Sequence, residues 1–212
     1  MPVTRDTVTD WMRRFAGEME ERRQELVRLD TAIGDGDHGT NMDRGMRKAL
    51  EKLDGAEQAD PGAVLKTVAM ALVSSVGGAA GPLYGTLFLQ MGGAMAGQEE
   101  VDLAGYVDAW RKGLEGVKAR GKAEPGDKTM VDALVPANDA LLAAIADGAS
   151  FGEALRRSAE AAEEGMKATT PLVARKGRAS YLGERSAGHQ DPGATSTYLL
   201  IKTAADSWDR DR

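Results

Sequence analysis

Residues 67–98 read TVAMALVSSVGGAAGPLYGTLFLQMGGAMAGQ, and this stretch contains no Asp, Glu, Lys, Arg or His. About 20 consecutive apolar residues would span a bilayer, so a membrane hairpin has to be considered. The stretch carries seven glycines and Pro82, however, and its apolar runs at 68–73 and 83–89 are short. We therefore interpret it as two buried helices joined by a glycine-rich turn, at which the backbone closely approaches another group.

The composition of the whole chain is that of a soluble globular protein. Of its 212 residues, 42% are hydrophobic and 28% are charged, which predicts a single domain over residues 1–212. The net charge of −6 argues against tight electrostatic binding of nucleic acid, and the absence of cysteine excludes a disulfide scaffold and thiolate metal sites. The first residues contain no apolar segment typical of a secretory signal, so we expect a cytoplasmic protein.

Helical periodicity is common along the chain, whereas alternation typical of strands is not found. The predicted N-caps are Thr4 or Asp6 for the first helix, Asp60 before Pro61, Asp102 and Ser150. The first helix carries its apolar face from Val8 to Leu29, and the others cover about 41–53, 61–76, 82–96, 103–117, 129–146, 151–166 and 193–207. The predicted fold class is therefore all-α, a bundle or barrel of about eight amphipathic helices.

Three aspartates lie close together in the segment DTAIGDGDHGTN, residues 30–41. Asp30, Asp35 and Asp37 are separated by glycines that let the loop fold inward. Unpaired carboxylates repel each other, and a hard cation among them makes the arrangement favourable. Magnesium is commonly held by one or two carboxylates together with substrate phosphates, so three aspartates suit two magnesium ions shared with a nucleotide.

Other loops offer groups that a nucleotide would need. The turn Gly77–Pro82 leads into a helix and predicts a phosphate cradle of backbone amides, although tight packing of small residues explains it equally well. Thr86, one turn later, either reaches a phosphate or bonds to the backbone. Met130 would cover an adenine face unless it belongs to the core, and Arg178 would neutralise phosphate charge.

Two familiar motifs are coincidences in this glycine-rich chain. Gly34, Gly36 and Gly39 fit the dinucleotide pattern G-x-G-x-x-G, but a helix precedes them instead of a strand. Residues 116–122 begin a Walker A pattern, yet Ala123 stands where the magnesium-binding hydroxyl is required. With no cysteine and no G-x-S-x-G elbow, acyl-transfer chemistry also lacks its parts.

Taken together, the segments 30–42, 76–86, 121–134 and 177–197 resemble the DhaL-type nucleotide-binding subunit of dihydroxyacetone kinase. The resemblance implies an antiparallel up-and-down barrel of eight helices, with Asp30, Asp35 and Asp37 holding two magnesium ions. It also implies a set of nucleotide-contacting positions: His38, Gly39, Thr40, Asn41, Ala79, Ala80, Gly121, Met130, Arg178, Asp191, Pro192 and Gly193. Ala80 departs from the serine usual in the family, which removes one hydroxyl contact to phosphate.

The reaction implied by the resemblance is in-line transfer of the γ-phosphoryl group from ATP to dihydroxyacetone. The sugar would be held on a separate DhaK-type subunit, so this chain needs no nucleophile of its own. ADP would stay bound as a cofactor and be rephosphorylated in place by a DhaM-type phosphocarrier of the phosphoenolpyruvate phosphotransferase system. Asp30, Asp35, Asp37 and Arg178 would then form the catalytic set.

Several alternatives stay open at this point. The chain is either an ADP-carrying subunit or an ATP-dependent kinase subunit for another short sugar such as erythrulose. A regulatory module that senses ADP without catalysis, with a transcriptional regulator as its partner, is a second class of function. A fatty-acid kinase domain shares a related aspartate loop. The oligomeric state, including a homodimer, is not determined by the sequence.

Overall fold

The structure is a computed structural model that describes residues 2–208. In this part of the chain it contains nine α-helices, one 3-10 helix and a two-stranded ladder. Their order is β1 (Val3–Thr4), α1 (Arg5–Glu21), α2 (Arg23–Ile33), α3 (His38–Asp54), α4 (Pro61–Ser75), α5 (Ala80–Ala94), β2 (Glu100–Val101), α6 (Leu103–Gly121), α7 (Val131–Ala146), α8 (Phe151–Ala168), η1 (Arg178–Ser186) and α9 (Pro192–Trp208).

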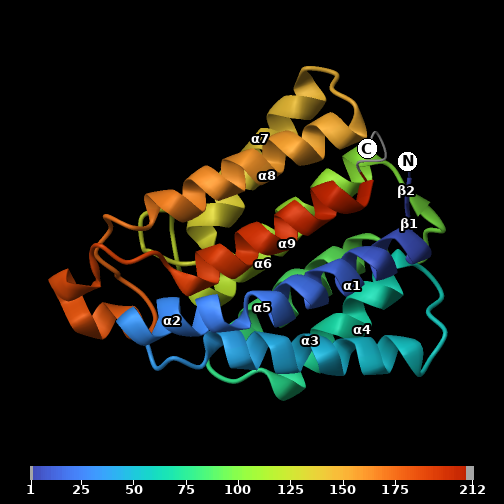
Figure 1. The fold of residues 1–212 in the computed structure, drawn as a ribbon. Helices are drawn as coiled ribbons and strands as arrows, with labels where there is room; N and C mark the ends of the chain where they lie inside the picture. Colours follow the sequence, from blue (N-terminus) through green and yellow to red (C-terminus); the bar gives the residue numbers. More distant parts are fainter. Residues whose placement is uncertain (1, 209–212) are drawn as a thin grey trace.

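The helices form a closed antiparallel ring, which confirms the all-α fold class (Figure 1). Each helix from α3 to α8 packs on the next one in the chain, α9 packs on α8, and α1 closes the ring between α9 and α3. The ring has eight members because α2 extends α1. The first helix, predicted to continue through Leu29, breaks at Arg22, where the dihedral ψ of 3° interrupts the helical conformation.

The local start signals in the sequence are confirmed where a side chain accepts a hydrogen bond from the first turn of the helix. The four side chains are those of Thr4, Asp60, Asp102 and Ser150. In contrast, the short antiparallel ladder between Val3–Thr4 and Glu100–Val101 was not expected from the sequence. Two residues per strand are too few to produce an alternating pattern.

The charge-free stretch 67–98 forms most of α4 and α5, a pair of helices packed against each other. A β-carbon added to Gly62 would come within 2.4 Å of the carbonyl oxygen of Gly92, so these two backbones meet without side chains between them. No helix in the described residues is long and apolar enough to cross a membrane. The expected pair of helices with a glycine turn is therefore present, but the pair is buried on one side only, since Met70, Val73 and Leu89 are exposed.

Aromatic side chains fill the middle of the ring. Trp11 is fully buried, with its ring centroid 6.3 Å from that of Phe88 and 6.1 Å from that of Trp110. Its indole N–H donates to the carbonyl oxygen of Leu200 at 2.9 Å, which satisfies its only polar atom. The middle of the ring is thus filled with side chains.

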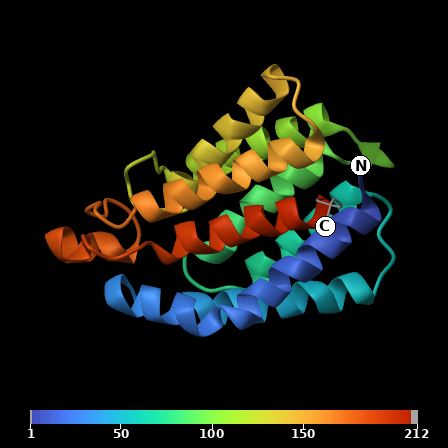
Figure 2. The ribbon, with the colours of Figure 1, turned by 45° about the horizontal axis from the view of Figure 1, so that its top comes forward.

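Four inter-helix connections gather at one end of the ring, at the left in Figures 1 and 2. They are 34–37, 76–79, 122–130 and 169–191, and the start of α1 lies at the other end. Every second connection of an antiparallel ring falls on the same side, which explains why segments distant in sequence meet here. The connections 34–37 and 122–130 are short because α2, α3 and α6 extend up to them, while the 3-10 helix η1 takes up part of the longer connection 169–191.

Candidate functional site

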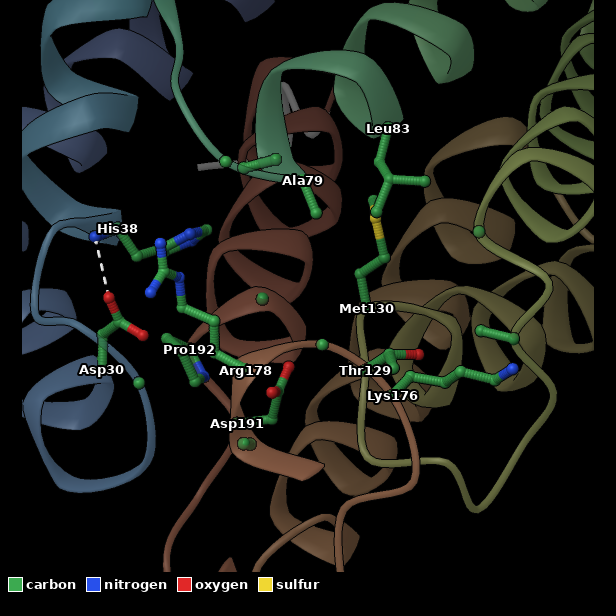
Figure 3. Close-up of a pocket in the computed structure, with 18 of the residues that line it drawn as sticks. Asp30, His38, Ala79, Leu83, Thr129, Met130, Lys176, Arg178, Asp191 and Pro192 are labelled. Carbon is green, nitrogen blue, oxygen red and sulfur yellow. Dashed lines mark hydrogen bonds between the residues drawn. The ribbon is translucent and has the colours of Figure 1, made fainter. Parts of the chain in front are cut away.

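The four connections enclose a cavity of about 460 Å³ (Figure 3). Its walls come from the end of α2, the turn before α5, the connection from α6 to α7, and the segment around η1 and the start of α9. Pockets of this size are typical of small-molecule and cofactor sites.

The three aspartates of the 30–41 segment meet at one edge of this cavity. Each offers a carboxylate oxygen, and these three oxygens lie within 4.8 Å of one another. Asp30 is buried in the last turn of α2, and its Oδ2 accepts hydrogen bonds from the backbone N–H groups of Asp37 at 2.8 Å and His38 at 3.0 Å. Asp35 and Asp37 are exposed. The α2–α3 connection is thereby folded around Asp30, with the two other carboxylates facing the same space.

The electrostatics of the cluster favour a bound cation. Burial raises the pKa of Asp30, the charges of Asp35 and Asp37 add to the rise, and the two N–H groups oppose it. A divalent cation would offset this concentration of negative charge, and carboxylate oxygens are the ligands that magnesium prefers. The donor set of this site therefore fits magnesium.

Arg178 is the cation that the chain itself places at the cluster. Its Nε lies 2.9 Å from Oδ2 of Asp35, and its side chain is 66% exposed. It is the first residue of η1 and follows Gly177, whose φ of +64° favours glycine. Arg178 lines the cavity, and in Figure 3 its side chain extends toward His38 and away from Asp191. An arginine in this position can hold phosphate oxygens by paired N–H donors.

The turn before α5 forms another wall of the cavity. Ala79 and Ala80 line it, and no side chain caps the first turn of α5, so the N–H groups of that turn are available to an anion. Asn41 lies beside this turn, and its Oδ1 accepts from Arg44 at 2.5 Å, while Arg44 also donates to the carbonyl oxygen of Ser75. These bonds fix the side chain of Asn41 in the wall.

His38 is held by a network of hydrogen bonds to buried hydroxyl groups. Its Nε2 is 2.9 Å from the hydroxyl of Ser196, and this hydroxyl lies 2.7 Å from that of Tyr84. Burial lowers the pKa of His38 to about 4, so the ring is neutral at pH 7. The network joins α3, α5 and α9 and determines how the ring faces the cavity.

The wall opposite the aspartates is largely apolar. Leu83 of α5 faces Met130, the residue just before α7 (Figure 3). Gly121, the last residue of α6, also lines the cavity. A β-carbon on Gly121 would come within 3.3 Å of Leu83. This narrow apolar slot suits a flat ring system, since dispersion and burial favour contact with both faces.

Asp191 closes the cavity at the start of α9. Its Oδ2 accepts from the N–H of Ala194 at 2.7 Å, so it caps the helix as its sequence position suggests. Burial raises the pKa of Asp191 to about 7. Pro192 and Gly193, which follow it, also line the cavity.

Most residues singled out from the sequence line this one cavity, and three do not. Gly39 lies where α3 packs on α2, since a β-carbon there would collide with the carbonyl oxygen of Arg23. The hydroxyl of Thr86 donates to the carbonyl oxygen of Pro82 at 2.7 Å. Of the two predicted roles for Thr86, the structure therefore shows the hydrogen bond to the backbone. Thr40 is exposed to solvent and does not line the cavity.

Sequence reasoning missed several lining residues that only the folded chain brings to the cavity. They are Leu83, Arg120, Lys128, Thr129 and Lys176. Leu83 and Thr129 have the residue types of ordinary core or cap positions, so nothing in the sequence distinguishes them.

Comparison with known proteins identifies similar sequences over nearly the whole chain. The DAK2 domain model matches residues 32–206. The chain is 43% identical to the PEP-dependent dihydroxyacetone kinase, ADP-binding subunit DhaL, of Escherichia coli, over 97% of this chain and 98% of that protein. It is 44% identical to the corresponding subunit of PEP-dependent dihydroxyacetone kinase 1 of Listeria innocua, over 95% and 96% of the two chains.

Longer relatives match over only part of their length. The L-erythrulose 1-kinase of Mycolicibacterium smegmatis is 39% identical over 86% of this chain, which is 32% of that protein. Among solved structures, the dihydroxyacetone kinase of C. freundii in complex with AMP-PNP and Mg2+ has a TM-score of 0.72 and 26% identity, and the match covers 98% of this chain and 35% of that one.

Proposed function

The chain belongs to the DAK2 domain family, and from this premise we propose that it is the ADP-binding subunit of a PEP-dependent dihydroxyacetone kinase. It would carry ADP or ATP with two magnesium ions and take part in transfer of the γ-phosphoryl group to dihydroxyacetone on a DhaK-type subunit. A DhaM-type phosphocarrier would regenerate ATP from the bound ADP.

The observation that carries this proposal is the shape and charge of the cavity enclosed by the four connections. Three carboxylate oxygens within 4.8 Å lie at one edge, and the apolar slot of Leu83 and Met130 lies across from them. A nucleotide needs both surfaces, metal ligands for its phosphates and an apolar slot for its base. The Mg2+ and AMP-PNP named for the related C. freundii kinase are consistent with this assignment.

Each part of the cavity then has a role in phosphoryl transfer. Asp30, Asp35 and Asp37 hold the metal ions, while Arg178 and the first turn of α5 hold phosphate oxygens. Magnesium, when bound, neutralises the charge of the phosphate oxygens and orients them. The chain supplies positioning and electrostatic stabilisation, and the attacking hydroxyl comes from the partner's substrate.

The extent of the matches favours a separate subunit. The ADP-binding subunits match over almost their full length, whereas the erythrulose kinases match over about a third of theirs. In a separate subunit of this kind, a partner subunit would supply the sugar.

A reconstituted reaction tests the proposal. The purified chain is combined with a DhaK-type subunit, a DhaM-type phosphocarrier, its upstream phosphotransferase proteins, phosphoenolpyruvate and dihydroxyacetone, and dihydroxyacetone phosphate is measured with a coupled dehydrogenase. We expect product with a trace of ADP and many turnovers per nucleotide. Product that needs stoichiometric ATP and no phosphocarrier would support the ATP-dependent kinase instead, and nucleotide binding without product would support the sensing module.

A further inference from the structure

Lys128 is a fully buried lysine next to the cavity, 1% exposed, in the connection between α6 and α7. Its ammonium donates to the backbone carbonyl oxygens of Thr169 at 2.8 Å, Leu172 at 3.1 Å and Thr170 at 3.4 Å, and also to that of His189. We refer to these four carbonyl oxygens as the carbonyl cage.

The chemistry of the carbonyl cage is that of a monovalent cation site. Four carbonyl dipoles point at one position, and a neutral amine there would turn a lone pair toward an oxygen. Burial lowers the pKa of Lys128, and the charges of Asp191 and Asp132 oppose that effect. The hydrogen-bond acceptors around the ammonium are all uncharged, so the carbonyl cage solvates it as it would a free cation.

The carbonyl cage joins two walls of the cavity. Lys128 directly precedes Thr129 and Met130 of the apolar slot, while its acceptors lie at the end of α8 and just before Asp191. The hydroxyl of Thr169 accepts from the N–H of Asp191 at 3.0 Å, so Lys128 and Asp191 are held by the same residue. Moving one wall therefore strains the other.

We propose that Lys128 is a positioning residue whose ammonium acts as a built-in cation in the carbonyl cage. It holds the cavity wall formed by Thr129 and Met130 in a fixed position relative to the wall formed by Asp191. The proposal rests on the proposed function, because the relative position of these two walls matters only if a nucleotide contacts both. Without the side chain, the cage is a site for a free monovalent cation.

Lys128→Ala tests this proposal because it removes the atoms that n-propylammonium contains. Lys122→Ala is the matched control, since Lys122 lies in the same connection, is exposed and also has a positive φ, 49° against 63° for Lys128. Both variants thus lose one positive charge and place an alanine at a position of positive φ. Only Lys128→Ala also empties the carbonyl cage. Dissociation constants for ADP with Mg2+ are measured by calorimetry, in n-propylammonium chloride or in tetramethylammonium chloride at equal ionic strength.

We expect Lys128→Ala to weaken ADP binding about 10- to 100-fold, the scale of losing a supporting partner around a site. n-Propylammonium should restore a large part of the affinity, whereas tetramethylammonium, which has no N–H donor, should not. Lys122→Ala should bind as the wild type does in both salts. Unchanged affinity in Lys128→Ala, or a loss that both salts affect equally, would overturn the proposal.

Thermal unfolding without nucleotide separates this proposal from the proposed function. The Tm of Lys128→Ala should rise in n-propylammonium relative to tetramethylammonium, and that of Lys122→Ala should not. If Lys128→Ala folds only when the amine is present, its helical content by circular dichroism in the two salts replaces the Tm as the measurement. A Tm that does not respond to the amine refutes the carbonyl cage, whereas wild-type protein that fails to bind ADP refutes the proposed function alone.

Discussion

The cavity has a charged region at each side, and the two are built in opposite ways. At the aspartate edge, three carboxylates share a small space, and Arg178 pairs with one of them. At Lys128, a buried positive charge is surrounded by four carbonyl oxygens, and no carboxylate within residues 2–208 forms an ion pair with it. The first region has an excess of charge that a ligand must balance, while the second carries its own cation.

The difference indicates which region reacts and which one supports. Charge that is left unbalanced in the folded chain costs stability and is retained where a ligand compensates for it. Charge that is solvated by the fold itself fixes segments in place. The aspartate edge should thus bind metal and nucleotide directly, whereas the carbonyl cage should affect their binding only through the segments that it holds in place.

The largest expected effect is the loss of metal ligands. Replacing Asp30, Asp35 or Asp37 singly by asparagine should reduce the rate of dihydroxyacetone phosphate formation roughly 100-fold or more, the scale of removing one electrostatic group from a transition state. The helical content by circular dichroism should not change. Asp139→Asn on the exposed side of α7 is the control and should keep the full rate. Full activity in all three variants would show that these carboxylates hold no catalytic metal.

The next effect concerns the cation at the aspartate edge. Arg178→Ala should reduce the transfer rate about 10- to 100-fold, because one charged donor to the phosphates is lost. Its side chain is two-thirds exposed, so the Tm should hardly change. Arg185→Ala, an exposed arginine at the other end of η1, provides the comparison. Equal rates for the two variants would exclude a role for Arg178 in transfer.

A third effect appears as pH dependence at Asp191. Its pKa in the folded chain is raised by burial from 3.8 to about 7, so its contribution to stability is present below about pH 4 and is lost as the pH rises to 7. Asp191→Asn keeps an oxygen for Ala194 and has no charge to bury. The free energy of unfolding of this variant, relative to wild type, should therefore increase between pH 5 and pH 8, measured with denaturant in EDTA without nucleotide.

Asp60→Asn is the control for this experiment, since Asp60 also caps a helix. Desolvation, which would raise the pKa of Asp60, is outweighed by backbone hydrogen bonds from Gly97 and Ala63, so this pKa is lowered. The difference between Asp60→Asn and wild type should stay flat from pH 5 to pH 8. If the free energy of unfolding relative to wild type changed with pH in the same way for both variants, Asp191 would not carry a buried charge.

The smallest effect is a gain of stability at the aspartate edge in the absence of ligand. Asp37→Asn relieves repulsion between carboxylates, so the Tm of the metal-free chain should rise by roughly 1–2 °C, as expected for an exposed charge pair. The rise in Tm that Mg2+ with ADP gives to the wild type should shrink in the same variant. A lower Tm in EDTA would show that the carboxylates do not repel each other in the free protein.

Much of the fold follows from local signals in the sequence. The caps at Thr4, Asp60, Asp102 and Ser150 were identifiable because a cap acts within three residues. The break at Arg22 was not, since the apolar face of α1 continues into α2 and gives the periodicity of one helix. The short β1–β2 ladder was missed because two residues leave no pattern.

The aspartate edge was predictable for the same reason as the caps. Asp30, Asp35 and Asp37 lie within eight residues, so the chain cannot separate them far. For Thr86, the sequence allowed both a phosphate contact and a bond to the backbone, and only the geometry of α5 distinguishes them.

By itself, the sequence determined the all-helical class, the four capped helix starts and the acidic cluster, because these depend on neighbours along the chain. The tertiary structure alone decided the carbonyl cage, whose acceptors lie 41 to 61 residues from Lys128. It also decided that Leu83 faces Met130 across the cavity. Both depend on the antiparallel packing of the helices, which brings alternate connections to one end and leaves no periodic trace in the residues that meet there.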